Sequence, residues 1–295
     1  MKISDVEAIE AEIADLEAKL SDAKVRLNSI QHRPSPFTSL PTPDLPSSSH
    51  HSLLLLSDSA LPLGSFAYSS GLESYIAHHK PLPSHVTPLL SFGSFLCLSI
   101  ESVGFTNVPY VLAGFRQPAL VAQLDNDLDA STPCTVARRA SIAQGRALLN
   151  VWEKALQQSI NHACTGALIA AEHIKSFARM LKLSALSSED IADINGHFAP
   201  LWGAVCLALG LEIKQVAYLF LFNHAKAVLS AAVRANVIGP YQAQSILAGQ
   251  HLQTQIRACL ARVWDVHPED AGQVVPSMDL WVGRHELLYS RIFNS

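Results

Sequence analysis

The spacing of the apolar residues constrains the fold of this chain more than any other feature. From Ser52 onward, apolar residues recur mostly at helical spacing, with little strand-like alternation of apolar and polar residues. Gly or Pro separates the apolar segments from one another. Chains with this pattern fold as helical bundles. The sequence therefore predicts an all-α fold, with one bundle domain of about ten helices over residues 52–295.

Local signals mark several helix boundaries. Gly210 separates two apolar segments, and Gly239 followed by Pro240 ends one helix and starts the next. Ser84 and Thr135 stand where their hydroxyls can cap the first turn of a helix. We expect helices over residues 69–79, 84–102, 106–115, 118–129, 134–158, 163–183, 197–209, 212–235, 240–263 and 280–293.

A separate pattern occupies the first 33 residues. Apolar residues from Val6 to Ile30 alternate at steps of three and four, which is the a/d pattern of a coiled coil. The five prolines of residues 34–46 and the Ser and His residues after them predict a linker over residues 34–51. We therefore expect three segments: a coiled-coil-like helix over residues 1–33, this linker, and the bundle domain.

The charges beside the heptad pattern favour one orientation of pairing. In a parallel pair of helices, Asp5 would face Glu10 and Glu12 would face another acid, so these contacts repel. In an antiparallel pair, Asp5 faces Arg33 and Glu12 faces Arg26, so these contacts attract. We expect the helix to pair antiparallel with a second copy or with a different partner helix; an unpaired, solvated helix is the alternative.

The composition indicates a protein that covers apolar surface with partners. Hydrophobic residues make up 49% of the 295 residues and charged residues 16%, against roughly 25% charged residues in a typical soluble domain. The excess of apolar residues favours burial against other proteins. The net charge of −4 argues against a nucleic-acid partner bound through a broad basic face.

Cysteine usage and hydropathy predict the compartment. The five cysteines are scattered and form no C-x-x-C motif, which fits a reducing cytoplasm. The acidic, amphipathic N-terminus differs from a signal or transit peptide. The two most apolar stretches, residues 86–115 and 203–233, contain charged side chains, so they predict buried helices rather than membrane spans. We expect a cytoplasmic protein with no membrane partner.

The chain contains no complete catalytic motif. It has neither a P-loop nor an H-E-x-x-H sequence, and the segment from Leu63 to Ala67 lacks the second Gly of a nucleophile elbow. His285 and Glu286 are adjacent but have no second His four residues later, and the other histidines are dispersed. We therefore expect a protein that is not an enzyme and has no catalytic residue, no cofactor and no metal site of its own.

Four segments resemble the urease accessory protein UreF family. Residues 53–73 are similar to the opening motif of that family, and residues 141–149 to its central Q-G-R-x-L-L segment. Residues 231–244 resemble its A-A-x-R helix junction, and residues 278–295 its C-terminal H-E-x-x-x-x-R-x-F-x-S ending. The four segments follow the order of the family and span the whole predicted bundle. Residues 1–51 are not part of the usual family pattern.

The resemblance implies an all-α chaperone that helps to load nickel into apo-urease. Members of the family act as homodimers and bridge the accessory protein UreD, called UreH in some organisms, to the nickel-carrying GTPase UreG. Nickel is then handled by the complex, not by a tight site in this chain. One alternative is a regulator of GTP hydrolysis by UreG through an arginine inserted in trans, for which Arg284 and Arg291 are the nearest candidates. Metal storage by the histidines and an unrelated helical adaptor are further alternatives.

The candidate partner-interface residues lie in the opening motif and the C-terminal ending. The turn of residues 61–64 can present Phe66 and Tyr68 outward as aromatic anchors. The alternative is that Phe66 and Leu72 pin this turn to the bundle. We expect Glu73 to pair with Arg146 or Arg234, and the C-terminal ending to become ordered when UreD binds. The candidates are Phe66, Tyr68, Glu73, His285, Glu286, Tyr289, Arg291 and Phe293.

Overall fold

The computed structural model describes residues 15–17, 19–20, 23–24, 48–162, 164–184 and 194–294. Contacts divide the chain into two units, Met1–Leu45 and Pro46–Ser295. In the first unit, Lys19 and Asp15 form an ion pair at 2.6 Å one helical turn apart. The residues that decide the predicted antiparallel pairing, Asp5, Glu12 and Arg26, lie outside the described residues, so that pairing stays a prediction.

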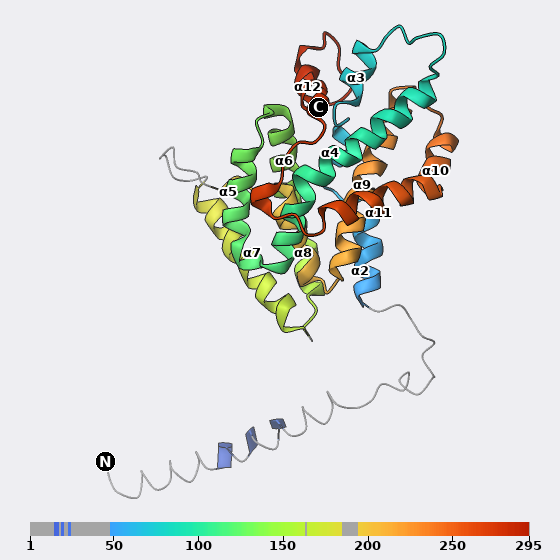
Figure 1. The fold of residues 1–295 in the computed structure, drawn as a ribbon. Coiled ribbons are helices and arrows are strands. Elements are labelled where there is room, and N and C mark those ends of the chain that lie inside the picture. The colour runs from blue at the N-terminus through green and yellow to red at the C-terminus, as the bar shows by residue number, and fades with distance from the viewer. Residues whose placement is uncertain are drawn as a thin grey trace, which may run out of the picture. The chain divides into compact units, whose positions relative to one another are not determined.

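The second unit confirms the predicted all-α fold, since its described residues form helices and connecting loops without a strand (Figure 1). The helices are α2 (Ser48–Ser57), α3 (Leu72–His78), α4 (Pro88–Arg116), α5 (Val121–Ser131), α6 (Thr135–Val151), α7 (Thr165–Ser184), α8 (Phe198–Ala208), α9 (Ile213–Arg234), α10 (Pro240–Ala248), α11 (Gln250–Val263) and α12 (Pro276–Arg284). Short helical turns are η1 (Ser65–Ala67), η2 (Pro118–Leu120), η3 (Trp152–Leu156), η4 (Gln157–Ser159), η5 (Pro268–Asp270) and η6 (His285–Leu287).

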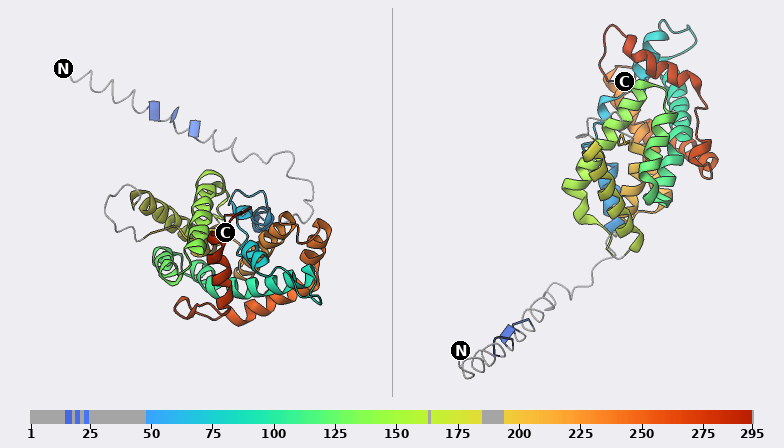
Figure 2. Two further views of the ribbon diagram at one scale, coloured as in Figure 1. Left: turned by 90° about the horizontal axis from the view of Figure 1, so that it is seen from above. Right: turned by 90° about the vertical axis from the view of Figure 1, so that its left-hand side faces the viewer.

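Helix α8 forms the centre of the bundle, packed against α4, α6 and α7. Only Phe198 and Leu207 among its residues keep substantial exposure. A helix that is apolar on all sides has no face for water, so it is stable only when other helices surround it. Figures 1 and 2 show a second group, in which α12 lies beside α3 at one end of the unit.

The backbones of α4 and α8 approach each other closely at two glycines. A Cβ atom on Gly203 of α8 would overlap the carbonyl oxygen of Val111, and one on Gly114 of α4 would overlap the carbonyl oxygen of Pro200. Neither overlap involves a flexible side chain, so larger residues at these positions would force the helices apart. The two glycines therefore set the distance between the central helices.

Helix α4 corrects the prediction of two helices over residues 84–102 and 106–115. The helix starts at Pro88, where the Thr87 hydroxyl accepts a hydrogen bond from the Leu90 N–H at 3.2 Å, instead of at Ser84. It then continues through Gly104 and Pro109, both of which are buried. Packing against α8, α9 and α11 outweighs the poor helix propensity of these two residues.

Other boundaries also differ from the prediction. Helix α2 begins at Ser48, inside the predicted linker, because its Ser52 and Leu56 are buried against the unit. The predicted helix over 240–263 is divided at Gly249, which has an extended conformation. The predicted helix over 280–293 starts earlier, at Pro276, and its last turn ends at Leu287. Gly210 and the Gly239–Pro240 boundary stand where predicted.

Helices α4 and α9 are long and apolar enough, by length and composition alone, to cross a membrane. Buried helices in the core of a water-soluble bundle have the same composition. Both helices pack in the unit, α4 against α8 and α9, and α9 also against α10 and α11.

Candidate partner-binding site

Residues from the opening motif and from the C-terminal ending line one open pocket on the bundle. Tyr68 directly follows η1, Arg139 lies on α6, and Arg291 and Phe293 belong to the C-terminal ending. The complete lining is Tyr68, Val136, Arg139, Ala140, Ala143, Glu286, Arg291, Phe293 and Asn294. We call this site the motif pocket, because it joins two sequence motifs that are more than 200 residues apart.

The motif pocket carries an excess of positive charge. Arg139 forms an ion pair with Glu286 across the pocket. Arg291 is exposed and has no ion pair within the described part of the chain. Burial raises the pKa of the Tyr68 phenol, although the charge of Arg139 partly opposes this shift, so Tyr68 is protonated at neutral pH. A guanidinium without a partner and a phenol that can donate a hydrogen bond suit an acidic or carbonyl group of another protein.

The C-terminal ending is attached to the bundle through Glu73. Oε1 of Glu73 accepts the N–H of Ile292 at 2.7 Å, and Oε2 accepts the N–H of Phe293 at 3.2 Å and Nε2 of His285 at 2.9 Å. The Asn294 N–H also donates to the carbonyl of Ala67 at 2.8 Å. The ending thus packs on its own chain.

These contacts correct the expectation that Glu73 pairs with Arg146 or Arg234. Arg146 donates instead to the carbonyl of Asn195 at 2.8 Å. Arg234 donates to the carbonyl of Phe66, and its guanidinium lies 4.4 Å from the centre of the Phe293 ring. No local sequence pattern predicts the Glu73 pairing, because its partners are the main chain and a histidine 212 residues away.

The other predicted interface residues divide into exposed and buried groups. Phe66 is 66% exposed, and Tyr289 is fully exposed. His285 is 0% exposed and Phe293 5%, so these side chains pack inside the chain. Nδ1 of His285 has no hydrogen-bond partner within the described ranges. The exposed group remains available to a partner, whereas the buried group holds the ending in place.

The central Q-G-R segment connects this region to the core. The Ser65 hydroxyl donates to Gln144 Oε1 at 2.9 Å, which fixes the opening motif on α6. A Cβ atom on Gly145 would overlap the carbonyl oxygen of Gly196, so glycine here lets the chain before α8 pass closely. The segment therefore holds η1 on one side and the start of α8 on the other.

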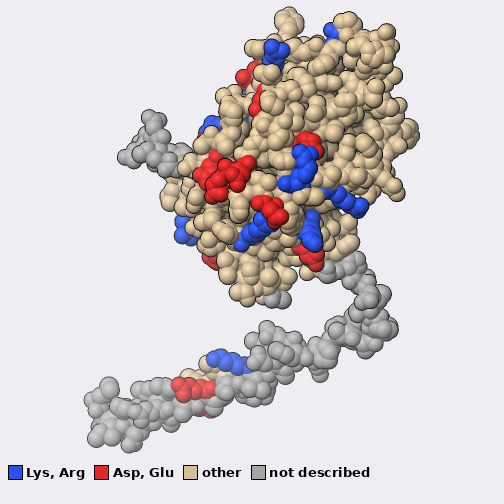
Figure 3. Space-filling view, viewed as in Figure 1, with Lys and Arg blue, Asp and Glu red and all other residues tan. Residues whose placement is uncertain are grey.

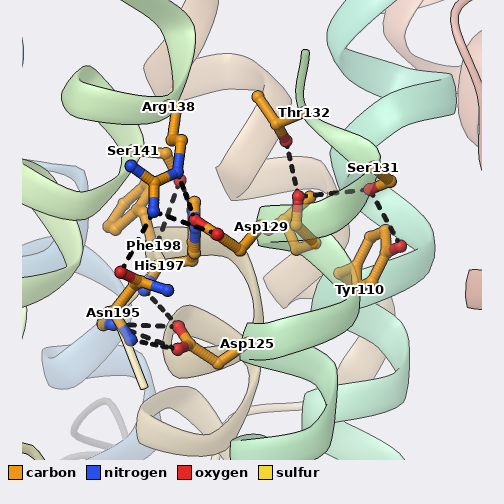
Figure 4. A network of polar contacts seen from close by, with 12 residues as sticks. Tyr110, Asp125, Asp129, Ser131, Thr132, Arg138, Ser141, Asn195, His197 and Phe198 are labelled. Carbon is orange, nitrogen blue, oxygen red and sulfur yellow. Dashed lines mark hydrogen bonds and ion pairs between the residues drawn. The ribbon is translucent and has the colours of Figure 1, made fainter. Parts of the chain in front are cut away.

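A second polar network, which sequence reasoning missed, surrounds the start of α8 (Figure 4). The buried Asp125 carboxylate accepts the backbone N–H groups of Asn195, Gly196 and His197 at 2.5 to 3.2 Å. Asp129, one helical turn later, accepts Nε2 of His197 at 2.9 Å. The four-residue spacing of two acids on one face of α5 was the available signal.

The same network contains a serine, a histidine and an aspartate in hydrogen-bonded order. Nδ1 of His197 lies 3.0 Å from Oγ of Ser141, and Nε2 lies 2.9 Å from Asp129. Acyl transfer also requires free N–H donors for an oxyanion. The nearby donors are occupied, since the Phe198 N–H points to Ser141 itself and those of the three preceding residues point to Asp125. This arrangement holds the segment that leads into α8.

Electrostatics support the structural role of Asp129 in this network. Burial would raise the pKa of the Asp129 carboxyl, but the hydrogen bonds and charges of Arg138 and His197 outweigh burial and lower it. The Arg138 guanidinium donates to both carboxylate oxygens at 2.5 and 3.0 Å. Asp129 is therefore charged and fully engaged at neutral pH.

A partly open pocket of about 410 Å³ lies between α4, α6 and α9. His224 lines it, with Nε2 2.8 Å from the Ser99 hydroxyl. Burial lowers the pKa of His224 to about 4, so the ring is neutral at physiological pH. Over the described ranges, no group of three or more His, Cys, Asp or Glu side chains is arranged to hold a metal ion.

Comparison of the sequence with known proteins identifies a family. The UreF family model matches residues 90–251, which is more than half of the chain. The chain belongs to the UreF family of urease accessory proteins. A Schizosaccharomyces pombe protein described as UreF-like is 38% identical over 245 residues, covering 83% of this chain and 97% of that protein.

Plant and bacterial members of the UreF family are similar over the same region. A urease accessory protein F of Oryza sativa is 31% identical over 241 residues, covering 81% of this chain and 82% of that protein. A urease accessory protein UreF of Paenarthrobacter aurescens is 26% identical over 242 residues, covering 81% of this chain and 95% of that protein. The similarity thus covers most of this chain and most of each relative, both in plants and in bacteria.

Proposed function

We propose that this UreF-family chain is a non-enzymatic scaffold that brings UreD (UreH) and the nickel-carrying GTPase UreG together during nickel insertion into apo-urease. The observation that carries the proposal is the motif pocket. This pocket is lined by Tyr68, from the start of the bundle sequence, and by Arg291 and Phe293, from its end. A site assembled from two distant motifs, with a guanidinium that has no ion pair among the described residues, is suited to recognising another protein.

Exposed apolar side chains beside the motif pocket support the same function. Four apolar side chains are each at least 64% exposed: Phe66, on η1, and Leu287, Tyr289 and Ile292, in the C-terminal ending. The two segments are joined by a hydrogen bond to the carbonyl of Ala67. Aromatic and aliphatic side chains next to an arginine are typical of the residues that dominate protein interfaces. Figure 3 shows in addition that much of one face of the molecule carries no charge.

The proposal assigns the remaining roles to the assembly. The scaffold acts as a cytoplasmic homodimer, and nickel passes between the partner proteins without a tight site in this chain. The family membership supports this division of roles, since relatives bear the name of accessory proteins.

Co-purification with UreD, UreG and apo-urease, followed by measurement of urease activation at limiting nickel, tests the proposal. The variant R291A should weaken binding of at least one partner by about tenfold, the expected loss for one charge-assisted contact. The matched control is R257A, because Arg257 is also exposed and lies on α11 away from the motif pocket. Equal binding by the two variants, or full urease activation in cells that lack this gene, contradicts the proposal.

A second candidate function is regulation of GTP hydrolysis by UreG. Arg284 and Arg291 are both exposed and have no ion pair within the described part of the chain, which an arginine inserted in trans requires. Single-turnover GTP hydrolysis by UreG, with and without this chain, separates the two functions. A scaffold leaves the hydrolysis rate unchanged, whereas a regulator changes it and loses the effect in R284A or R291A.

A further inference from the structure

We propose that Glu73 is the positioning residue of the motif pocket: its carboxylate holds the main chain at Ile292 and Phe293, and thereby places the pocket-lining residues of the C-terminal ending. This inference rests on the proposed function, because it explains how the partner-binding site is kept in shape. Glu73 is not among the residues that line the motif pocket, so its role is indirect.

The Glu73 carboxylate binds both the end of α12 and the residues near the end of the chain. On one side it accepts Nε2 of His285, at the end of α12, at 2.9 Å. On the other side it accepts the N–H groups of Ile292 and Phe293 at 2.7 and 3.2 Å. One side chain from α3 thus fixes both ends of the segment 285–293. A carboxylate is suited to this role because its two oxygens accept several hydrogen bonds at once.

The histidine orients this carboxylate. Because Nε2 of His285 faces a carboxylate oxygen, Nε2 carries a proton and donates it to Glu73. Nδ1 has no hydrogen-bond partner within the described residues, although the ring is fully buried. A buried polar atom without a hydrogen-bond partner costs free energy. The hydrogen bond from Nε2 of the same ring to Glu73 offsets this cost.

The position of the C-terminal ending depends on few other contacts. Beyond Leu287, Phe293 has the only buried side chain of the described residues, and its ring lies beneath the guanidinium of Arg234. The Asn294 N–H adds one bond to Ala67. A chain end with so little buried surface frays unless something holds it. The two N–H groups bound by Glu73 belong to the residues directly after Arg291. These bonds therefore determine the position of the Arg291 main chain and the direction of its side chain.

The experiment compares the full chain with its E73Q and E73A variants by hydrogen exchange and partner binding. E73A removes both acceptor oxygens, and E73Q keeps one. The matched control is E172Q, which removes an exposed carboxylate of α7 that lies 3.8 Å from Lys175. Amide exchange of the peptide covering residues 288–294 should become at least about tenfold faster in E73A, and less so in E73Q, because main-chain hydrogen bonds to a charged group are lost.

Partner binding should follow the same order. Affinity for the protein that occupies the motif pocket should fall by about tenfold in E73A, with a smaller loss in E73Q and none in E172Q, while exchange of α8 peptides stays slow in all variants. If E73A does not fold, the same comparison is made between E73Q and E172Q. Unchanged exchange of residues 288–294 in the folded Glu73 variants overturns the proposal.

The two proposals fail in different ways. A variant with a loosened C-terminal ending and undiminished partner binding overturns the positioning role of Glu73 and leaves the scaffold function intact. An unaltered chain that binds neither UreD nor UreG overturns the scaffold function, whatever the exchange of its ending.

Discussion

Removal of the Asp125 carboxylate provides a direct test of how the core is held together. Asp125 is fully buried on α5 and accepts three consecutive main-chain N–H groups, from Asn195 to His197, immediately before α8. In D125A these donors lose their acceptor, and those of Gly196 and His197 are buried where water does not replace it. The start of α8, the helix that α4, α6 and α7 share, would then be poorly fixed.

The expected loss follows from the number and type of the bonds. A hydrogen bond to a charged group contributes about 1.5–3 kcal/mol, and a buried donor left without an acceptor costs about 1–3 kcal/mol. The carboxylate also carries a desolvation cost that the alanine removes, which offsets part of the loss. We therefore expect D125A to lower the free energy of unfolding by about 3 kcal/mol, which corresponds to a fall in Tm of about 6–12 °C in a protein of this size.

The assay is thermal and urea unfolding followed by circular dichroism. The matched control is D127A, because Asp127 lies on the same helix, is exposed, and gains the same helix propensity on replacement by alanine. D125N should lie between the two, since its amide keeps one acceptor oxygen. A Tm for D125A within 2 °C of the D127A value (about 1 kcal/mol or less) would refute the reasoning that this carboxylate fixes the segment that leads into α8.

Two further predictions concern pH and packing. The pKa of His224 is about 4 in the folded chain, below its ordinary value of 6.5, so the unfolded state binds more protons between these values. The contribution of neutral His224 to the free energy of unfolding is fully present above pH 6.5 and falls by on the order of 3 kcal/mol towards pH 4. Urea titrations at several pH values should show a shallower fall in the free energy of unfolding for H224Q and an unchanged fall for the exposed-site control H251Q. The variant G203A should lose about 1–3 kcal/mol, because its Cβ atom meets the Val111 carbonyl. G93A, a helix glycine of α4 with no atom within 4 Å, should be neutral or slightly stabilised; equal Tm values for these two glycine variants would contradict the close approach.

Local patterns explain why much of the fold could be predicted from the sequence. Helix propensity, glycine and proline boundaries and apolar spacing act within a few residues, so they identified all-α structure and the boundaries at Gly210 and Gly239. The prediction failed where packing overrode these signals. The prediction placed a break at residues 103–105, yet contacts with three other helices keep α4 continuous through Gly104.

The candidate site was predictable in part for the same reason. Tyr68, Arg291 and Phe293 belong to recognisable motifs, and the structure brings them to one pocket. The pairing of Glu73 with His285 depends instead on how two ends of the chain meet, which no local pattern contains. Whether these residues bind partners stays a prediction until binding is measured.

The central position of α8 has a consequence for synthesis on the ribosome. Helices α4, α6 and α7 all precede α8 in the chain, and each packs against it. Until Ala208 has left the exit tunnel, these three helices lack their common neighbour and expose apolar side chains to solvent. Nascent chains with such exposure aggregate readily or bind general chaperones. We expect general chaperones to associate with this polypeptide during that interval and to dissociate once α8 has emerged.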